Sequence, residues 1–345
     1  MIHWLIPILT LMRLFYLKRE KQNIGFQLLI ILLFPLILWI AGFETKSTKL
    51  FFLLLLLIFG LFICFTLLSL LLSFICYECL IIILFFSLFL FIPSFYRIRT
   101  AFFSFLFSIF GSLSSILSNI IFIFCNSIFS IPIIIPFFIK IPSFPFFYRL
   151  PEVHCEANTS ISLSSAGLFS KISIYGILRF ILSSFFLALR FRSSFVLSFT
   201  LIGIILVSAS CFRYYDLKKI IAFSSILHLN ITLCALYSLS GTGLLSSILI
   251  SLSHAFSSIG LSLYCGLLIL WTYSRYIDSL FYLSSTMRGV LLLFILANLS
   301  FPGTLNFIGE VTALIAIVSI DTFSILSSSF YWISFCIIWN STIPL

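Results

Sequence analysis

The chain has 345 residues, of which 62% are hydrophobic and only 8% are charged, and its net charge is +10. Soluble domains carry charge on about a quarter of their residues, so this composition excludes a water-soluble protein and indicates one that crosses a membrane many times. The basic residues lie in short connections between apolar stretches, which is typical of membrane-protein loops and excludes a nucleic-acid-binding patch.

The apolar segments predict the membrane-spanning helices, because about 20 apolar residues span a bilayer. Twelve segments approach or reach that length: 2–17, 26–42, 50–72, 74–94, 101–120, 128–149, 157–185, 192–212, 217–238, 243–271, 287–320 and 323–342. The boundary near residue 73, between the third and fourth segments, is placed only so that each of these two segments crosses the membrane once. Since the connections are short, we expect consecutive helices to pack antiparallel, with no soluble domain. The sequence therefore predicts an all-α polytopic membrane helix bundle of about 12 transmembrane helices.

The fourth segment carries an acidic residue, Glu78, between Cys76 and Cys79. A charge at the middle of a bilayer costs roughly 2.5–3.5 kcal/mol, so an ionisable residue there is a candidate functional residue. An unpaired buried carboxylate would bind a proton, whereas one beside a lysine can stay ionised. Two alternatives stay open, a permanently neutral Glu78 or a position at the membrane boundary. The cysteines are interpreted as small buried hydrophobic residues, because their spacing matches no metal site.

The sixth segment is irregular around Lys140. Four prolines surround this lysine: Pro132, Pro136, Pro142 and Pro145. Proline breaks a helix, and in lipid a broken helix is tolerated only where it faces protein or a wet cavity. Burial favours the neutral form of Lys140 and a nearby carboxylate favours its charged form, so the group can switch when its partner moves. The alternative is a lysine near a helix end whose amine extends to the membrane surface.

Lys171 lies at the centre of the seventh segment, within a run of small and hydroxyl residues at 164–173 that allows close packing and hydration. Two histidines fall inside later segments, His228 in the ninth and His254 in the tenth. Histidine titrates near neutrality and can relay protons through its two ring nitrogens, although a single buried histidine is more often structural. Their place in the chain between Lys171 and Glu310 favours a relay.

The eleventh segment is too long for one span and contains Pro302-Gly303 just before Glu310. This second break lies five segments after the first. Because five is odd, two five-helix units would have opposite orientations, as in the inverted repeats of secondary transporters. We therefore predict an antiporter-like fold of inverted five-helix repeats with two broken helices. The expected divisions of the single membrane domain, 1–345, are reduced N-terminal helices at 1–72, a first repeat at 73–185 and a second repeat at 186–342.

Several groups of residues follow one another in a specific order. They are Lys140-Ile141-Pro142, Leu150-Pro151-Glu152-Val153-His154-Cys155-Glu156-Ala157, Leu168-Phe169-Ser170-Lys171 with Tyr175-Gly176 and Arg179, Asp216-Leu217-Lys218 with His228, Ser253-His254-Ala255, and Ala297-Asn298 with Pro302, Asn306 and Gly309-Glu310. These motifs resemble those of the antiporter-like membrane subunits of respiratory complex I, NADH:ubiquinone oxidoreductase, and among them the chain 4 branch. The resemblance covers about residues 75–312, and its match around Tyr77-Glu78 is weaker.

The resemblance implies a proton-translocating core subunit that holds no cofactor itself, with FMN and iron–sulfur clusters in partner subunits. The implied proton relay consists of the acid–base pair Glu78 and Lys140, the central lysine Lys171, the bridging His228 and His254, and the terminal Glu310. The expected partners are other complex I subunits, especially neighbouring antiporter-like chains and a lateral helix, together with membrane lipids and no nucleic acid. The expected location is the mitochondrial inner membrane.

The sequence also departs from that family. The family has fourteen helices, so the chain is expected to lack the family's first helix and to end one helix early. Asn158 replaces a customary proline, Ile161 a customary glycine and Arg149 a customary aromatic residue, and the stretch 151–156 with His154 is expected to be a loop. Two other functions stay open: a stand-alone Na+/H+ antiporter of the same superfamily, and a structural scaffold of the membrane arm with an idle channel.

Overall fold

The computed structural model of the chain describes residues 21–44, 48–67, 69–89, 95–125, 138–181, 186–282 and 284–319. Its helices are α2 (Lys21–Glu44), α3 (Thr48–Thr66), α4 (Leu70–Phe89), α5 (Phe95–Cys125), α7 (Arg149–Glu156), α8 (Thr159–Ser164), η1 (Ser165–Phe169), α9 (Ser170–Gly176), η2 (Ile177–Ile181), α11 (Phe186–Cys211), α12 (Leu217–Tyr237), α13 (Gly241–Thr272), η3 (Ile277–Tyr282), α14 (Ser285–Asn298) and α15 (Leu305–Val318). The predicted spans 2–17 and 323–342 lie outside the described residues.

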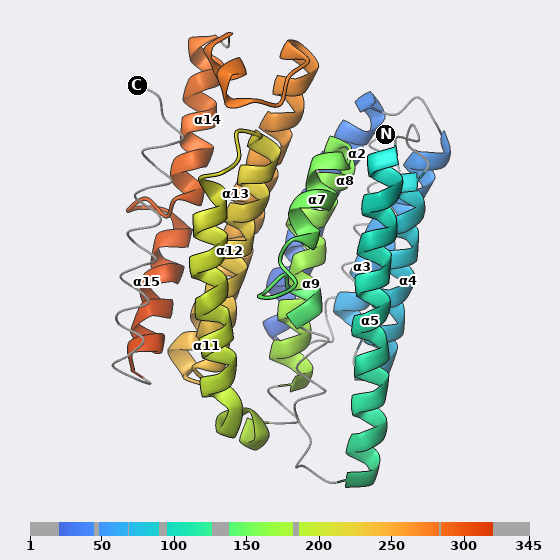
Figure 1. Cartoon of the computed structure of the whole chain (residues 1–345), viewed down its shortest axis with the longest axis vertical. Helices are drawn as coiled ribbons and strands as arrows, with labels where there is room; N and C mark the ends of the chain where they lie inside the picture. Colours follow the sequence, from blue (N-terminus) through green and yellow to red (C-terminus); the bar gives the residue numbers. More distant parts are fainter. Residues whose placement is uncertain are drawn as a thin grey trace.

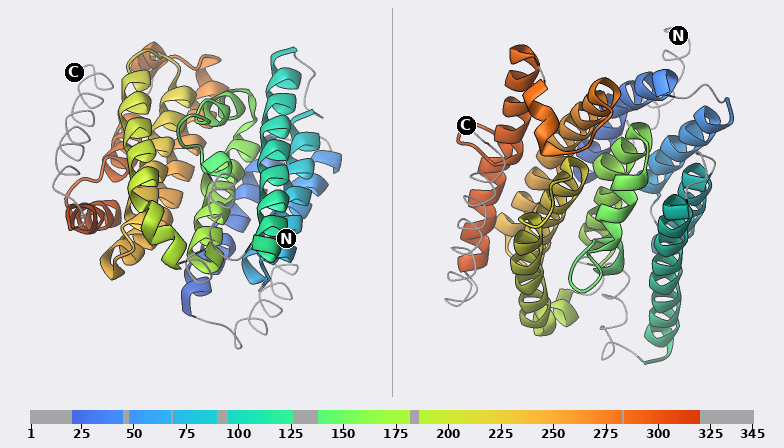
Figure 2. Two further views of the ribbon diagram at one scale, coloured as in Figure 1. Left: turned by 60° about the horizontal axis from the view of Figure 1, so that its bottom comes forward. Right: turned by 45° about the horizontal axis from the view of Figure 1, so that its top comes forward.

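The helices run side by side in three groups (Figure 1). The run α7–α9 lies between α3–α5 on one side and α11–α15 on the other, and both views in Figure 2 agree with this order. Helix α2 passes behind this run and contacts both α3 and α13. The middle group contacts both neighbours, since α8 packs on α2, α7 packs on α5 and α12, and η1 packs on α13. Groups placed on α7–α9 therefore lie in the interior of the bundle.

Within the described residues, six helices are long and apolar enough to cross a membrane. An apolar 18-residue stretch of Thr159–Arg179 and one of Leu217–Tyr237 each have 89% of their residues buried, against 39% for the corresponding stretch of Thr48–Thr66. The outer helices instead expose large apolar side chains such as Phe52 and Phe59, which lipid accommodates and water would not. The prediction of an all-α membrane bundle is confirmed for the described part of the chain.

The boundary predicted near 73 lies earlier in the structure. Helix α3 ends at Thr66 and α4 begins at Leu70. The Thr66 hydroxyl donates to the carbonyl of Ile63 at 2.8 Å, which satisfies an acceptor in the last turn of α3. Glu78 therefore lies well inside α4 and not at the end of a helix.

The prediction of a loop at 151–156 is wrong, because these residues belong to α7. Pro151 and Glu152 lie in its first turn, where a proline is tolerated and an acidic side chain is favourable. The other end of α7 is held by two cations: Lys218 Nζ donates to Ala157 O at 3.0 Å, and Arg275 Nη1 donates to Cys155 O at 3.0 Å. Positive charge at a helix C-terminus is stabilising, so α7 is a fixed element.

The second predicted break is present, and the described part of the first is irregular, while Pro132 and Pro136 lie outside the described residues. In the sixth segment, the described residues form one helical turn at 138–140 and then run irregularly until α7 begins, so Lys140 ends a helical turn. In the eleventh segment, α14 and α15 are separated by 299–304, where Gly303 has a φ of +102° that favours glycine. The Thr304 side chain caps α15 by accepting from the amide of Phe307.

The seventh span contains two π-helical stretches that the sequence did not predict. They are η1 and η2, and α9 with Lys171 lies between them. A π-helical turn disturbs the regular hydrogen bonding of an α-helix and is frequent at functional sites. The stretches η1 and η2 therefore place Lys171 between two irregular turns of the span.

Candidate functional site

Glu78 of α4 and Lys140 form an ion pair at the first break. Lys140 Nζ lies 3.4 Å from Glu78 Oε1. The same amine lies 4.0 Å from the ring centroid of Tyr77 and 4.1 Å from that of Phe74, which adds cation–π attraction. Lys140 is only 9% exposed, so its amine does not extend to the membrane surface. The structure thus brings together the predicted acid–base pair.

Lys171 of α9 is fully buried and has a different kind of environment. Its Nζ donates to Ala166 O at 2.6 Å and lies 3.4 Å from His254 Nδ1, with the donor in the second contact set by the histidine tautomer. Ala166 belongs to η1, and its carbonyl group also accepts from the Ser170 hydroxyl at 3.1 Å. The nearest polar atoms of Lys171 are therefore neutral acceptors.

Two histidines and a glutamate continue the line from Lys171. The ring centroids of His254 on α13 and His228 on α12 lie 4.8 Å apart. His228 Nδ1 lies 3.0 Å from Glu310 Oε1 on α15. His228, His254 and Glu310 are each 2% exposed. The four residues, from four different helices, form one continuous buried line.

An asparagine network holds the broken helix against the rest of the bundle. Asn306 Nδ2 donates to Ala297 O across the break at 3.0 Å, and its side-chain oxygen accepts from Ser253 of α13. Asn298 accepts from Ser257 of α13 at 3.1 Å and donates to Ser224 of α12 at 3.2 Å. This network fixes the start of α15 and so positions Glu310. The two asparagines stood in the sequence motifs, but the motifs alone indicated no role for them.

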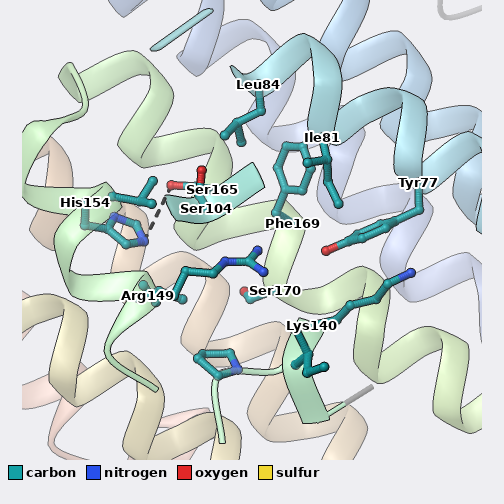
Figure 3. Close-up of a pocket in the computed structure, with 14 residues that line it drawn as sticks. Tyr77, Ile81, Leu84, Ser104, Lys140, Arg149, His154, Ser165, Phe169 and Ser170 are labelled. Carbon is teal, nitrogen blue, oxygen red and sulfur yellow. Dashed lines mark hydrogen bonds between the residues drawn. The ribbon is translucent and has the colours of Figure 1, made fainter. Parts of the chain in front are cut away.

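A cavity of about 60 Å³ lies next to Lys140 (Figure 3). It extends from Lys140 to Ser170, the neighbour of Lys171 in the chain. Its polar lining includes Tyr77, Ser104, Arg149, His154 and Ser165. Most of the lining surface is apolar, but a cavity of this volume with these polar groups has room for several water molecules. Water is a good carrier of protons between groups that do not touch.

His154 and Arg149 were not among the predicted site residues, yet both line this cavity. His154 Nε2 lies 3.5 Å from the Ser165 hydroxyl. The interpretation of 151–156 as a loop placed His154 outside the bundle, and only the helical structure of α7 turns it inward. Among the described residues, no group of three or more His, Cys, Asp or Glu side chains is arranged to hold a metal ion.

Comparison with known proteins places the chain in a family. Residues 86–335 match the family described as "NADH:quinone oxidoreductase/Mrp antiporter, TM". NADH-ubiquinone oxidoreductase chain 4 of Marchantia polymorpha is 32% identical over 329 residues, covering 87% of this chain and 66% of that protein. The Chondrus crispus chain 4 protein is 41% identical over 192 residues, covering 54% of this chain and 38% of that protein. The chain therefore spans less than two thirds of the length of these relatives.

Solved structures show the same fold. A chain of respiratory complex I from Thermus thermophilus with bound NADH superposes with a TM-score of 0.80 at 18% identity, covering 93% of this chain and 74% of that chain. A chain of the Mrp complex from Dietzia sp. DQ12-45-1b gives a TM-score of 0.74 at 15% identity, covering 91% and 39%. The predicted antiporter-like architecture is confirmed at the level of the fold.

Proposed function

Because this chain belongs to the NADH:quinone oxidoreductase/Mrp antiporter family of transmembrane proteins, we propose that it is the proton-translocating chain 4 subunit of respiratory complex I. The curated relatives described above are all chain 4 proteins, which supports the choice within the family. The observation that carries the proposal is the buried line Lys171, His254, His228 and Glu310, each group within contact of the next.

The first step is the opening of the ion pair between Glu78 and Lys140. A change elsewhere in the complex increases the distance between the carboxylate and the amine. A buried ammonium that loses its counter-charge is disfavoured, so Lys140 releases a proton into the cavity. Two charges about 4 Å apart attract by about 4 kcal/mol at an effective dielectric constant of 20. Moving a charge against 100 mV costs about 2.3 kcal/mol, so one such pair supplies an energy of the right order.

The second step moves the proton laterally. The Lys171 amine takes up the proton and becomes an ammonium group, and its contact with His254 Nδ1 then allows transfer to the imidazole. Each histidine gains a proton on one ring nitrogen and loses one from the other. The Glu310 carboxylate beside His228 receives the proton at the end of the line.

We further propose the finer organisation expected from the sequence. The single membrane domain, 1–345, consists of N-terminal helices at 1–72, a first inverted repeat at 73–185 and a second at 186–342. The proposal is supported by the two helix breaks, the first close to Lys140 and the second close to Glu310. The proposed location is the mitochondrial inner membrane. The proposed partners are the other complex I subunits, including neighbouring antiporter-like chains, a lateral helix and the subunits that hold FMN and iron–sulfur clusters.

The substitution Lys140→Met tests the function directly. It keeps the length and apolar stem of the side chain and removes the titrating amine, so proton pumping or coupled quinone reduction should be lost while the complex still assembles. Lys49→Met is the matched control, because Lys49 is exposed in the first turn of α3 and should pump normally. Unchanged pumping in Lys140→Met would instead support a structural scaffold with an idle channel.

Purification separates the proposal from a stand-alone Na+/H+ antiporter. A complex I subunit co-migrates with flavin and iron–sulfur proteins in mild detergent. Migration of the intact chain without any redox protein would favour the antiporter.

A further inference from the structure

The geometry points to Arg149 as a positioning residue for the proton switch, a fixed positive charge that favours release of the proton from Lys140 while Glu78 stays ionised. This inference rests on the proposed function and adds a third charged member to the Glu78–Lys140 pair. Arg149 acts through its neighbours and need not exchange a proton itself.

Arg149 is held at the edge of the cavity that Lys140 also lines. It is the first residue of α7, whose far end is fixed by the contacts of Lys218 and Arg275. Figure 3 shows its guanidinium group directed toward the Tyr77 hydroxyl, and the Tyr77 ring lies against the Lys140 amine. Within the described part of the chain, the buried Nη1 of Arg149 has no hydrogen-bond partner. The guanidinium group acts on Tyr77 through its charge and as a hydrogen-bond donor, and it acts on Lys140 through its charge.

The charges of the site can be summed for each protonation state. Arg149 interacts electrostatically with both Glu78 and Lys140, and a guanidinium group does not lose its proton in a protein. With Lys140 charged, the three groups sum to one positive charge. With Lys140 neutral, Arg149 and Glu78 balance and the sum is zero. A net charge is costly inside a membrane protein, so Arg149 favours the neutral amine.

Other titratable groups also face this site, and they come from three elements. Cys64 lies on α3, Tyr77 on α4 and His154 on α7, where His154 is close to Lys171 and Lys218. Arg97 lies 3.8 Å from Glu156 and so forms a separate ion pair at the other end of α7. Among the described charged groups that interact with Lys140, Arg149 is the cation that keeps its charge in every state of the switch.

The proton balance of the step is simple. When the pair opens, Lys140 Nζ changes from ammonium to amine and the proton passes through the cavity to the Lys171 amine, which becomes ammonium. Glu78 and Arg149 keep their charges throughout. The pair of fixed opposite charges left behind prevents Glu78 from recapturing the proton, because the carboxylate already has a counter-charge.

The test compares Arg149→Gln, Arg149→Lys and the control Arg288→Gln, which removes an exposed arginine of α14. Proton pumping by the intact complex in vesicles is measured as a function of pH. Without the fixed charge, Lys140 holds its proton more tightly, so the acidic limb of the Arg149→Gln profile should move to higher pH by roughly one to two units. Arg149→Lys keeps a charge and should stay close to the unsubstituted complex, as should Arg288→Gln.

An unchanged profile for Arg149→Gln would overturn the inference, and so would equal shifts in Arg149→Gln and Arg149→Lys, because shape rather than charge would then matter. Arg149→Met repeats the neutral substitution if the Gln variant does not assemble. If neither neutral variant assembles while Arg149→Lys does, the charge serves folding and the inference is wrong. Normal proton pumping by the Lys140→Met variant would instead contradict the proposed function on which the inference rests.

Discussion

At the scale of single residues, the two buried lysines differ in what they contact. Lys140 faces a carboxylate at 3.4 Å, whereas Lys171 faces a carbonyl oxygen at 2.6 Å and a histidine nitrogen at 3.4 Å. A carboxylate favours a stable ammonium group, and neutral acceptors allow the amine to gain and lose a proton. The contacts therefore suit Lys140 to a switch and Lys171 to a relay.

His254 occupies the central position of the line, between Lys171 and His228. The substitution His254→Gln keeps a polar side chain but removes the group that takes up a proton, so we expect proton pumping to fall by at least about a hundredfold. The measurement is the initial rate of proton release by assembled complex. Phe256→Leu, an exposed position on the same helix, is the control and should pump normally. Pumping at the normal rate in His254→Gln would exclude this residue from the path.

The ionisable residues were predictable from the sequence because charge is so rare in its spans, but their contacts were not. Lys171 and His254 are 83 residues apart in the chain, and only the packing of α9 on its neighbours brings them together. Arg149 was visible as a departure from the family pattern. Its relation to the Glu78–Lys140 pair depends on the position of α7, which the sequence did not predict.

At the scale of helices, proline and glycine predicted the break before α15, and the apolar segments gave no signal for α7. Pro302-Gly303 marked the gap between α14 and α15, because glycine adopts the positive φ that the turn requires. The loop expected at 151–156 lies between two apolar segments, and apolar length gives no signal for a short polar helix such as α7. Its proline lies in the first turn, where it is compatible with the helix. The π-helical stretches η1 and η2 leave no comparable local signal. They were therefore beyond prediction from sequence.

Helix packing around the site depends on close approach at Gly266 of α13. A methyl group there would overlap the side chain of Thr159 on α8, with only 2.9 Å to its Cβ. Because Thr159 is branched and cannot turn aside freely, Gly266→Ala should destabilise the protein by about 1–3 kcal/mol. Gly289→Ala on α14 is the matched control, because nothing lies within 4 Å of the added atom. It should be neutral or stabilise by up to about 1 kcal/mol.

Thermal inactivation of the purified complex measures both glycine variants. A lower inactivation temperature for Gly266→Ala, with no loss for Gly289→Ala, is the expected result. Equal stability of the two variants would show that α8 and α13 do not pack as closely as the structure places them.

At the scale of the whole molecule, the order of the helices explains how an apolar membrane protein accommodates ionisable side chains. The outer helices present apolar side chains, whereas the apolar 18-residue stretches of the spans with Lys171 and His228 have 89% of their residues buried. The bundle thus encloses a polar line that runs across several helices, with a cavity at one end. The match with the antiporter-like fold extends over 93% of the chain. The sequence motifs covered less, about residues 75–312.

The ratio of protons pumped to electrons transferred in complex I carrying Lys171→Met tests the central claim most directly. This substitution leaves the Glu78–Lys140 pair in place and removes the group that joins it to the histidines. The account predicts that the complex assembles and that its pumping ratio falls, or that coupled quinone reduction stops with it. A normal ratio at a normal rate of quinone reduction would contradict the account, because protons would then cross without the buried line.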